Sequence, residues 1–279
     1  MPPPTPRRDR VSVFRLFLLE TFPALCASRP IILDVAGGKG DLSWLLSNAS
    51  PRVDSVVVDP RPADHSKLTK LADWCVANPG EAAARARPWP PGSGQGMAKL
   101  NIVPPYVVPR HLKLFVDDGM VDAALRRDES WAEYFSVASD RADRDEAKSS
   151  TDPRQKSALK LPDEGRIQDA GEALACLRGA GLVVGFHPDS ATEPAVDLAL
   201  ELQVPFAVVP CCVFPRSILM GGERRTRAGV KVVGYDDFIV YLKEKHPNVR
   251  ERVLDFASTK GGSVGARNVV LYMLSEDYE

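Results

Sequence analysis

Two aspartates and a group of glycines lie close together in the first quarter of the chain. Asp34 precedes the glycine turn 36–40, and Asp59 follows nineteen residues after Gly40. Such a turn between a strand and a helix lets the backbone approach a ligand, and the helix N-terminus adds unpaired amides. Asp34 would repel a phosphate, and the glycine spacing matches neither the dinucleotide fingerprint nor the P-loop. Since Asp59 is placed to accept hydrogen bonds from two ribose hydroxyls, a cationic nucleoside without phosphate fits both acids.

S-adenosylmethionine is a nucleoside of this kind. The segment Asp34-Val35-Ala36-Gly37-Gly38-Lys39-Gly40 resembles the first motif of class I S-adenosylmethionine-dependent methyltransferases, with Ala36 in place of the first glycine. The resemblance implies a cofactor site, with S-adenosylhomocysteine as the product. The residues it implies in that site are Asp34, Ala36, Gly37, Gly38, Gly40, the ribose-binding Asp59, and Asp117 or Asp118 beside the adenine. A purely structural turn with surface acids is the alternative.

A second group of polar residues follows two later strands. His187 and Asp189 come directly after one predicted strand, and Cys211 and Cys212 end the next. Residues just past the carboxyl ends of strands line the ligand crevice of an open α/β sheet, so His187 and Asp189 are expected to face the transferred methyl group, with His187 also beside the cofactor. Histidine, with an unperturbed pKa of about 6.5, can accept the proton that methyl transfer releases.

The pairing of this histidine segment with the adjacent cysteines resembles a methyltransferase subgroup. The subgroup includes eukaryotic tRNA 2′-O-methyltransferases of the acceptor stem and related methyltransferase-like proteins. This sequence departs from it at Pro188-Asp189 and at Val213-Phe214, so the resemblance does not define the acceptor atom. The resemblance covers about thirty residues.

Plainer interpretations of the same residues stay open. His187 could simply satisfy the end of a strand, and at least one of the two cysteines could be core, because free cysteine is often buried. The Pro-Cys pair is also similar to that of cytosine-5 methyltransferases, which use a thiolate as nucleophile, but the sequence lacks the partner residues that such a nucleophile needs. No metal is expected, since no second cysteine pair or Cys/His cluster completes four ligands.

A local excess of positive charge follows the cysteine pair. The segment 216–231 carries five cations against Glu223, whereas the whole chain has a net charge of −1. Contacts to phosphates would give such a segment affinity for RNA, with tRNA or rRNA expected as the partner. The cations are Arg216, Arg224, Arg225, Arg227 and Lys231. The alternative is a solvated loop without a ligand.

Alternating apolar runs and helical patterns predict how these groups are positioned. They indicate a single α/β domain over residues 1–279, with a Rossmann-like, doubly wound, mostly parallel sheet. The predicted strands are 31–35, 53–58, 112–116, 182–186, 207–211 and 269–274. The predicted helices are 11–25, 42–46, 170–178, 192–202 and 236–245. Two segments break the pattern: a Pro/Gly-rich irregular insertion at 79–109 and a mobile charged segment at 140–166.

Composition narrows the class of protein further. The chain has 279 residues, of which 44% are hydrophobic and 26% charged, as expected of a globular protein. Its longest apolar stretch, 204–214, is too short for a membrane span. Five cysteines without a disulfide framework favour a reducing intracellular compartment, cytoplasm or nucleus, with the mitochondrion as an alternative. Two other functions compete with an RNA methyltransferase. One is an inactive methyltransferase-like assembly factor in a ribonucleoprotein, and the other is a methyltransferase for small molecules or proteins.

Overall fold

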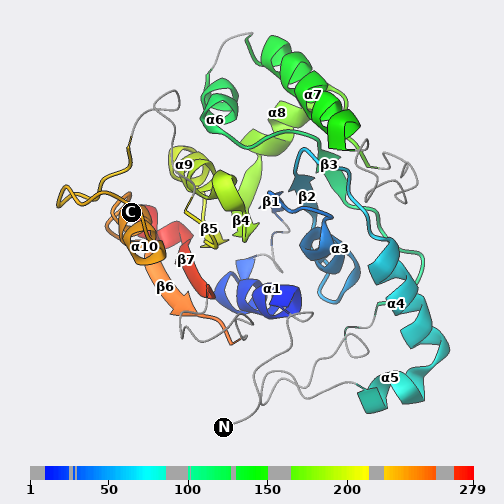
Figure 1. Cartoon of the computed structure of the whole chain (residues 1–279). Helices are drawn as coiled ribbons and strands as arrows, with labels where there is room; N and C mark the ends of the chain where they lie inside the picture. The colour runs from blue at the N-terminus through cyan, green and yellow to red at the C-terminus, as the bar shows by residue number, and fades with distance from the viewer. Residues whose placement is uncertain are drawn as a thin grey trace.

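Seven strands form one sheet in the order β3-β2-β1-β4-β5-β7-β6 in the computed structural model (Figure 1). The structure describes residues 10–24, 28, 30–85, 100, 102–126, 130–149, 165–213, 223–255 and 267–279. The strands are β1 (Ile31–Val35), β2 (Ser55–Val58), β3 (Arg110–Leu112), β4 (Ala180–Phe186), β5 (Phe206–Val209), β6 (Arg250–Val253) and β7 (Val269–Met273). The first five run parallel, and β7 pairs antiparallel with both β5 and β6. The predicted α/β class with a mostly parallel sheet is confirmed.

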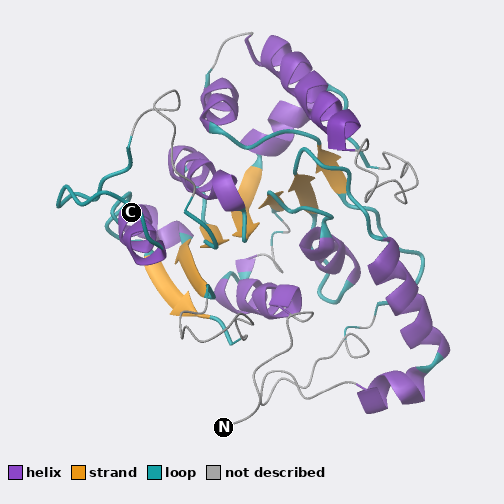
Figure 2. Ribbon diagram, in the orientation of Figure 1, coloured by secondary structure: helices purple, strands orange, loops and turns teal. Residues whose placement is uncertain are grey.

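Helices cover both faces of this sheet (Figure 2). They are α1 (Arg10–Thr21), α3 (Asp41–Asn48), α4 (Ser66–Ala77), α5 (Pro79–Arg85), α6 (Asp118–Leu125), α7 (Ser130–Ser149), α8 (Ala170–Arg178), α9 (Thr192–Leu202) and α10 (Tyr235–Lys243). Among the residues that the structure describes, no helix has the length and apolar character needed to span a bilayer.

The two faces of the sheet contribute to two separate hydrophobic clusters. Along β1, Leu33 packs in the cluster that includes residues of α6, α8 and α9, whereas its neighbour Ile32 packs with α1 and α3. This alternation follows from the period of two in a strand. Burial on both faces explains why β1 and β2 consist mainly of branched apolar residues, with Asp34 and Ser55 as buried polar exceptions.

Helix α1 is held against the sheet by an aromatic contact and by a buried charge. Phe14 stacks on Phe186 of β4, with ring centroids 5.2 Å apart. Arg15 is 3% exposed and donates to the carbonyl oxygens of Ala49, Ser50 and Pro51, which follow α3. All three bonds come from Nη2, so one end of the guanidinium binds the C-terminal end of α3, where helix carbonyls lack partners.

Parts of the two irregular segments are helical, which corrects the prediction. Residues 79–85 form α5, because proline is tolerated in the first turn and Glu81 favours a helix N-terminus. Residues 140–149 belong to α7, where Asp143 binds the buried Lys113 at 2.6 Å and Arg166 at 3.0 Å. The charges of this segment therefore anchor a helix. Residues 86–99, 101 and 150–164 lie outside the described part of the chain.

Candidate functional site

The carboxyl ends of four parallel strands bring the predicted site residues to one edge of the sheet. Strand order reverses between β1 and β4, which is where ligands bind in open α/β sheets. The turn 36–40 follows β1, Asp59 follows β2, segment 187–189 follows β4, and residues 211–212 follow β5. The positive charge of Arg61 acts on both Asp59 and Asp189, so these strand ends share one electrostatic environment.

The glycine turn has a left-handed backbone at three positions. Ala36 has φ of 50°, Gly38 of 61° and Gly40 of 79°. Gly40 precedes α3 directly and is its N-cap. A non-glycine residue such as Ala36 is strained in this region, and strained residues are concentrated at functional sites. The turn therefore matches the sharp strand-to-helix connection that the sequence predicts.

Replacing Gly40 by alanine is expected to lower the free energy of unfolding by about 2–3 kcal/mol, through backbone strain and overpacking. A Cβ atom there would lie 2.7 Å from Cε1 of His65 and 3.0 Å from Cγ2 of Val57. Gly229→Ala is the matched control, because Gly229 has φ of 81° with no atom within 4 Å of an added Cβ. Urea unfolding of both variants measures the difference. Equal losses would contradict the close packing at Gly40.

Asp34 lies beneath the glycine turn, in the interior. It is 1% exposed, and its Oδ2 accepts a hydrogen bond of 2.8 Å from the Ser43 hydroxyl, which in turn contacts the Ser55 hydroxyl. A Cβ on Gly37 would lie 2.7 Å from the same Oδ2, so the turn closes directly over the carboxyl group. Burial raises the pKa of Asp34 to about 7. Asp34 therefore supports the turn from below, and its carboxyl group has no solvent-facing surface.

Asp59 is oriented towards the glycine turn, as predicted, and is already engaged by the protein. Its Oδ2 accepts a hydrogen bond of 2.8 Å from the Gly38 amide. Arg61 binds both carboxylate oxygens: Nε lies 3.0 Å from Oδ1 and Nη2 lies 3.0 Å from Oδ2. The Asp59 side chain is 1% exposed, whereas that of Arg61 is 69% exposed. A ribose can reach Asp59 from the solvent side only if this guanidinium moves.

His187 and Asp189 occupy a strained loop after β4. Their φ angles are 59° and 51°, on either side of Pro188. Burial, assisted by the positive charge of Arg10, lowers the pKa of His187 to about 4, so its imidazole is neutral at pH 7. Asp189 is exposed, and its Oδ1 accepts a hydrogen bond of 2.9 Å from the Cys211 thiol. The structure thus joins two predicted groups that are 22 residues apart.

Asp117 and Asp118 lie at the start of α6. Asp117 caps this helix by accepting from the Met120 amide at 3.0 Å, and it also pairs with Arg141 at 3.1 Å. Asp118 lines an open groove of about 660 Å³ between α6, α9 and α10. The other groove residues are Val121, Asp122, Leu125, Arg126, Glu193, Asp197, Glu201, Tyr241 and Lys245. Asp117 is therefore occupied by structural contacts, and Asp118 borders a groove whose lining combines five acidic with two basic residues.

The predicted basic segment is partly neutralised by its own neighbours. Arg224 is buried against Glu193, with Nε 2.5 Å from the carboxylate. Arg225 and Lys231 both pair with Glu223 but remain more than half exposed. The Arg227 guanidinium donates to the Glu244 carbonyl oxygen. Arg216 lies outside the described residues.

Two residues that the sequence analysis did not select lie against the site. Arg61 covers Asp59. Arg61 lies only two residues after Asp59, in the loop that follows β2, and this short spacing is the feature of the sequence that could have predicted the ion pair. His65 packs on Gly40, and burial lowers its pKa to about 4. Within the described structure, neither ring nitrogen of His65 has a hydrogen-bond partner. No spacing rule in the sequence indicates that this histidine folds back onto the turn.

Comparisons with protein-family models, with curated proteins and with solved structures find no match for this chain.

Proposed function

We propose that the protein is an S-adenosylmethionine-dependent methyltransferase acting on RNA, with tRNA or rRNA as the substrate. The observation that carries the proposal is the hydrogen bond of 2.8 Å between the Gly38 amide and Asp59. It joins the glycine turn to the acid of the next strand at the switch point, where a nucleoside is expected to bind.

The sheet supports the same assignment. The order β3-β2-β1-β4-β5 is that of nucleotide-binding folds, and an antiparallel β7 next to β5 distinguishes this sheet from the six-stranded dinucleotide order. The glycine turn resembles the first motif of class I methyltransferases, and the sheet of that family contains such an antiparallel strand. The polar groups also fit an adenosyl group, because the Asp59 carboxylate can accept hydrogen bonds from ribose hydroxyls and the turn offers backbone amides as donors.

Binding requires Arg61 to release one side of Asp59. The Arg61 side chain is 69% exposed, so its guanidinium can move into solvent, and the ribose hydroxyls would replace its hydrogen bonds to the buried carboxylate. Asp59 would then stay fixed by the Gly38 amide and accept from the ribose. When bound, S-adenosylmethionine supplies a methyl group on a sulfonium centre. Asp34, at a pKa of about 7, would support the turn without touching this cofactor.

On the acceptor side, the loop after β4 supplies the polar groups. His187 is neutral at pH 7 and can accept a hydrogen bond from an acceptor hydroxyl, although a pKa of about 4 makes it a weaker base than free imidazole. The exposed Asp189 can orient the same hydroxyl. The buried pair of Arg224 with Glu193 fixes the basic segment to the first turn of α9, which follows this loop. Arg225, Arg227 and Lys231 follow Arg224 in the same segment and would contact phosphates of the RNA.

A non-catalytic assembly factor is the second candidate. The guanidinium of Arg61 occupies both oxygens of Asp59, and this observation favours a fold that has lost its cofactor. The two candidates differ in whether Asp59 still binds the nucleoside.

Isothermal titration with S-adenosylmethionine separates the two candidates. The wild type is expected to bind, and Asp59→Ala is expected to bind at least tenfold more weakly, a loss of about 1.4 kcal/mol or more. Asp54→Ala is the control, because Asp54 precedes the same strand at its opposite end and pairs with Arg110. Arg61→Ala is expected to bind more tightly, since Asp59 is then free. No binding by the wild type or by Arg61→Ala would contradict the methyltransferase proposal and support the assembly factor.

Transfer of a tritiated methyl group identifies the substrate class. The wild type is expected to label total RNA, and His187→Ala is expected to label it more slowly. Labelling of protein in place of RNA would contradict the RNA assignment while leaving the cofactor site intact.

A further inference from the structure

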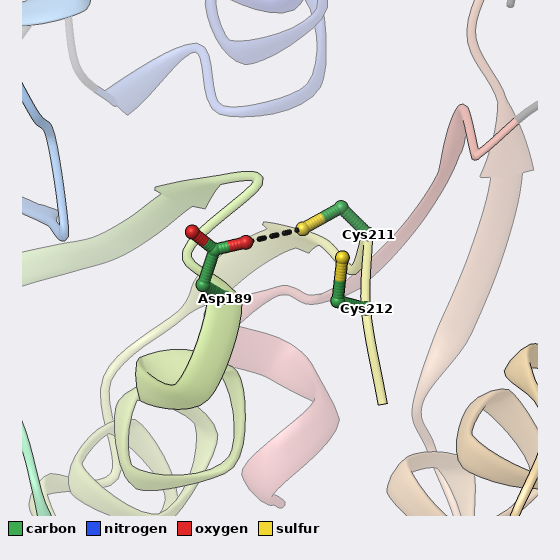
Figure 3. A group of neighbouring side chains, drawn as sticks. All are labelled: Asp189, Cys211 and Cys212. Atoms are coloured by element: carbon green, nitrogen blue, oxygen red, sulfur yellow. Dashed lines mark hydrogen bonds between the residues drawn. The ribbon is translucent and has the colours of Figure 1, made fainter. Parts of the chain in front are cut away.

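Three potential metal ligands converge at the carboxyl ends of β4 and β5 (Figure 3). They are one oxygen of Asp189 and the sulfur atoms of Cys211 and Cys212, and all three lie within 4.8 Å of one another. Cys211 Sγ and Asp189 Oδ1 lie 2.9 Å apart. Figure 3 shows both sulfur atoms on the side of the chain that faces Asp189.

The local backbone explains why adjacent cysteines face the same way. Neighbouring residues in a strand point to opposite faces, but β5 ends at Val209 and Pro210 follows it. Both cysteines therefore lie outside the regular strand. On the other side, Asp189 has φ of 51°, a strained conformation that turns its carboxylate towards Cys211.

We propose that Asp189, Cys211 and Cys212 bind a Zn²⁺ ion through three protein ligands, leaving one coordination position open. Zinc prefers thiolate, imidazole and carboxylate ligands, and an open fourth position is typical of catalytic zinc. Zn–S bonds of about 2.3 Å and Zn–O bonds of about 2.0–2.2 Å place tetrahedral ligand atoms about 3.6–3.8 Å apart. Separations of up to 4.8 Å reach this geometry through side-chain movements of about an ångström.

The charges around the cluster are compatible with a divalent cation. Binding of Zn²⁺ would release the two thiol protons to solvent, because thiolates are the ligating form. Two thiolates and one carboxylate then carry −3, and the ion reduces this to −1. The Arg267 guanidinium lies 3.5 Å from Cys212 Sγ, and the charge of Arg61 acts on Asp189, so both cations offset the remainder.

This site differs from the metal site considered in the sequence analysis, which required a second cysteine pair or a Cys/His cluster. The sequence lacks a second cysteine pair, whereas the third ligand comes from the end of another strand, 22 residues earlier than Cys211. The inference does not rest on methyl transfer. A water molecule, or an oxygen or sulfur atom of a small molecule, would complete the coordination.

Cobalt titration of the reduced full-length protein under anaerobic conditions tests the site. One equivalent of Co²⁺ is expected to produce a thiolate-to-cobalt charge-transfer band, and Zn²⁺ is expected to abolish it. Cys212→Ser is expected to lose most of the band, and Asp189→Asn to bind at least tenfold more weakly. Cys75→Ser is the matched control, because Cys75 lies on α4 outside the cluster. No band in the wild type, or an unchanged affinity in Asp189→Asn, would overturn the proposal.

A second measurement needs only the wild type, in case a variant fails to fold. Zn²⁺ is expected to slow alkylation of Cys212 at least tenfold and to leave Cys75 unchanged, as measured by peptide mass mapping. Equal alkylation of Cys212 with and without Zn²⁺ would also overturn the site. Neither measurement uses S-adenosylmethionine, so failure here is distinct from failure of the proposed function.

Discussion

Replacing Glu193 by alanine is expected to lower the free energy of unfolding by about 3–5 kcal/mol, because the change removes the carboxylate that faces the buried guanidinium of Arg224, whereas Lys245 keeps its ion pair with Asp197. Glu193 is 2% exposed in the first turn of α9. It accepts from Arg224 Nε at 2.5 Å, from Lys245 Nζ at 3.0 Å and from the Tyr241 hydroxyl. One carboxylate thus joins α9, the basic segment and the region of α10.

The ionisation of Glu193 follows from the same contacts. Burial raises its pKa, but Lys245, Tyr241 and Arg224 outweigh burial and hold the pKa at about 2. The stability that this carboxylate provides is therefore present above its unfolded pKa, near 4.5, and is lost as the pH falls through about 2. Alanine removes this contribution over the whole range in which the native carboxylate is charged.

Urea unfolding at pH 7 measures the effect. Glu201→Ala is the control, because Glu201 lies on the same helix and is exposed, and such substitutions usually change stability by less than about 0.5 kcal/mol. Glu193→Gln is expected to lose less than alanine, since an amide oxygen can still accept from one of the donors. A loss below about 1 kcal/mol for Glu193→Ala would mean that Arg224 finds another partner.

The buried elements of the fold are those that the sequence predicts best. The mainly apolar, branched runs of β1 and β4 identify buried strands, and helices α8 and α9 begin and end at the predicted residues. Strand β6 is not predicted, because all four of its residues are exposed and three are charged. Its position depends on pairing with β7, which no local pattern encodes.

For the candidate site, the sequence predicts which strand ends meet but not how the side chains pair. Topology alone brings Asp59 to the glycine turn. In contrast, the burial of Arg224 and the covering of Asp59 by Arg61 depend on tertiary contacts between charges. A count of cations in a segment cannot separate a guanidinium that binds Glu193 from one that faces solvent.

The carboxyl group of Asp34 is expected to make the protein less stable as the pH rises. Its pKa is about 7 in the folded protein, because burial disfavours the charged form, against 3.8 for an aspartate in water. The folded state therefore binds more protons than the unfolded state between these two values. By linkage, the contribution of Asp34 to stability is full below about pH 4 and is lost as the pH rises through about 7.

Asp34→Asn is expected to remove this loss, which is the second large effect. A rise of the pKa from 3.8 to about 7 corresponds to about 4 kcal/mol. This is the expected change, between pH 4 and pH 8, in the stability difference between variant and wild type. His65 and His187, each with a pKa of about 4, act in the opposite direction, since their stability is lost as the pH falls from 6.5. Both histidines are present in each protein and cancel in the difference.

Urea unfolding of wild type, Asp34→Asn and the half-exposed control Asp54→Asn at several pH values isolates the effect. The asparagine amide adds an offset that does not depend on pH, because Ser43 can still donate to its oxygen whereas its nitrogen is buried. The quantity to compare is therefore how much the stability difference between Asp34→Asn and the wild type changes with pH. If it stays below about 1 kcal/mol, the carboxyl group beneath the glycine turn is hydrated, and the turn is more open at Asp34 than its closure by Gly37 indicates.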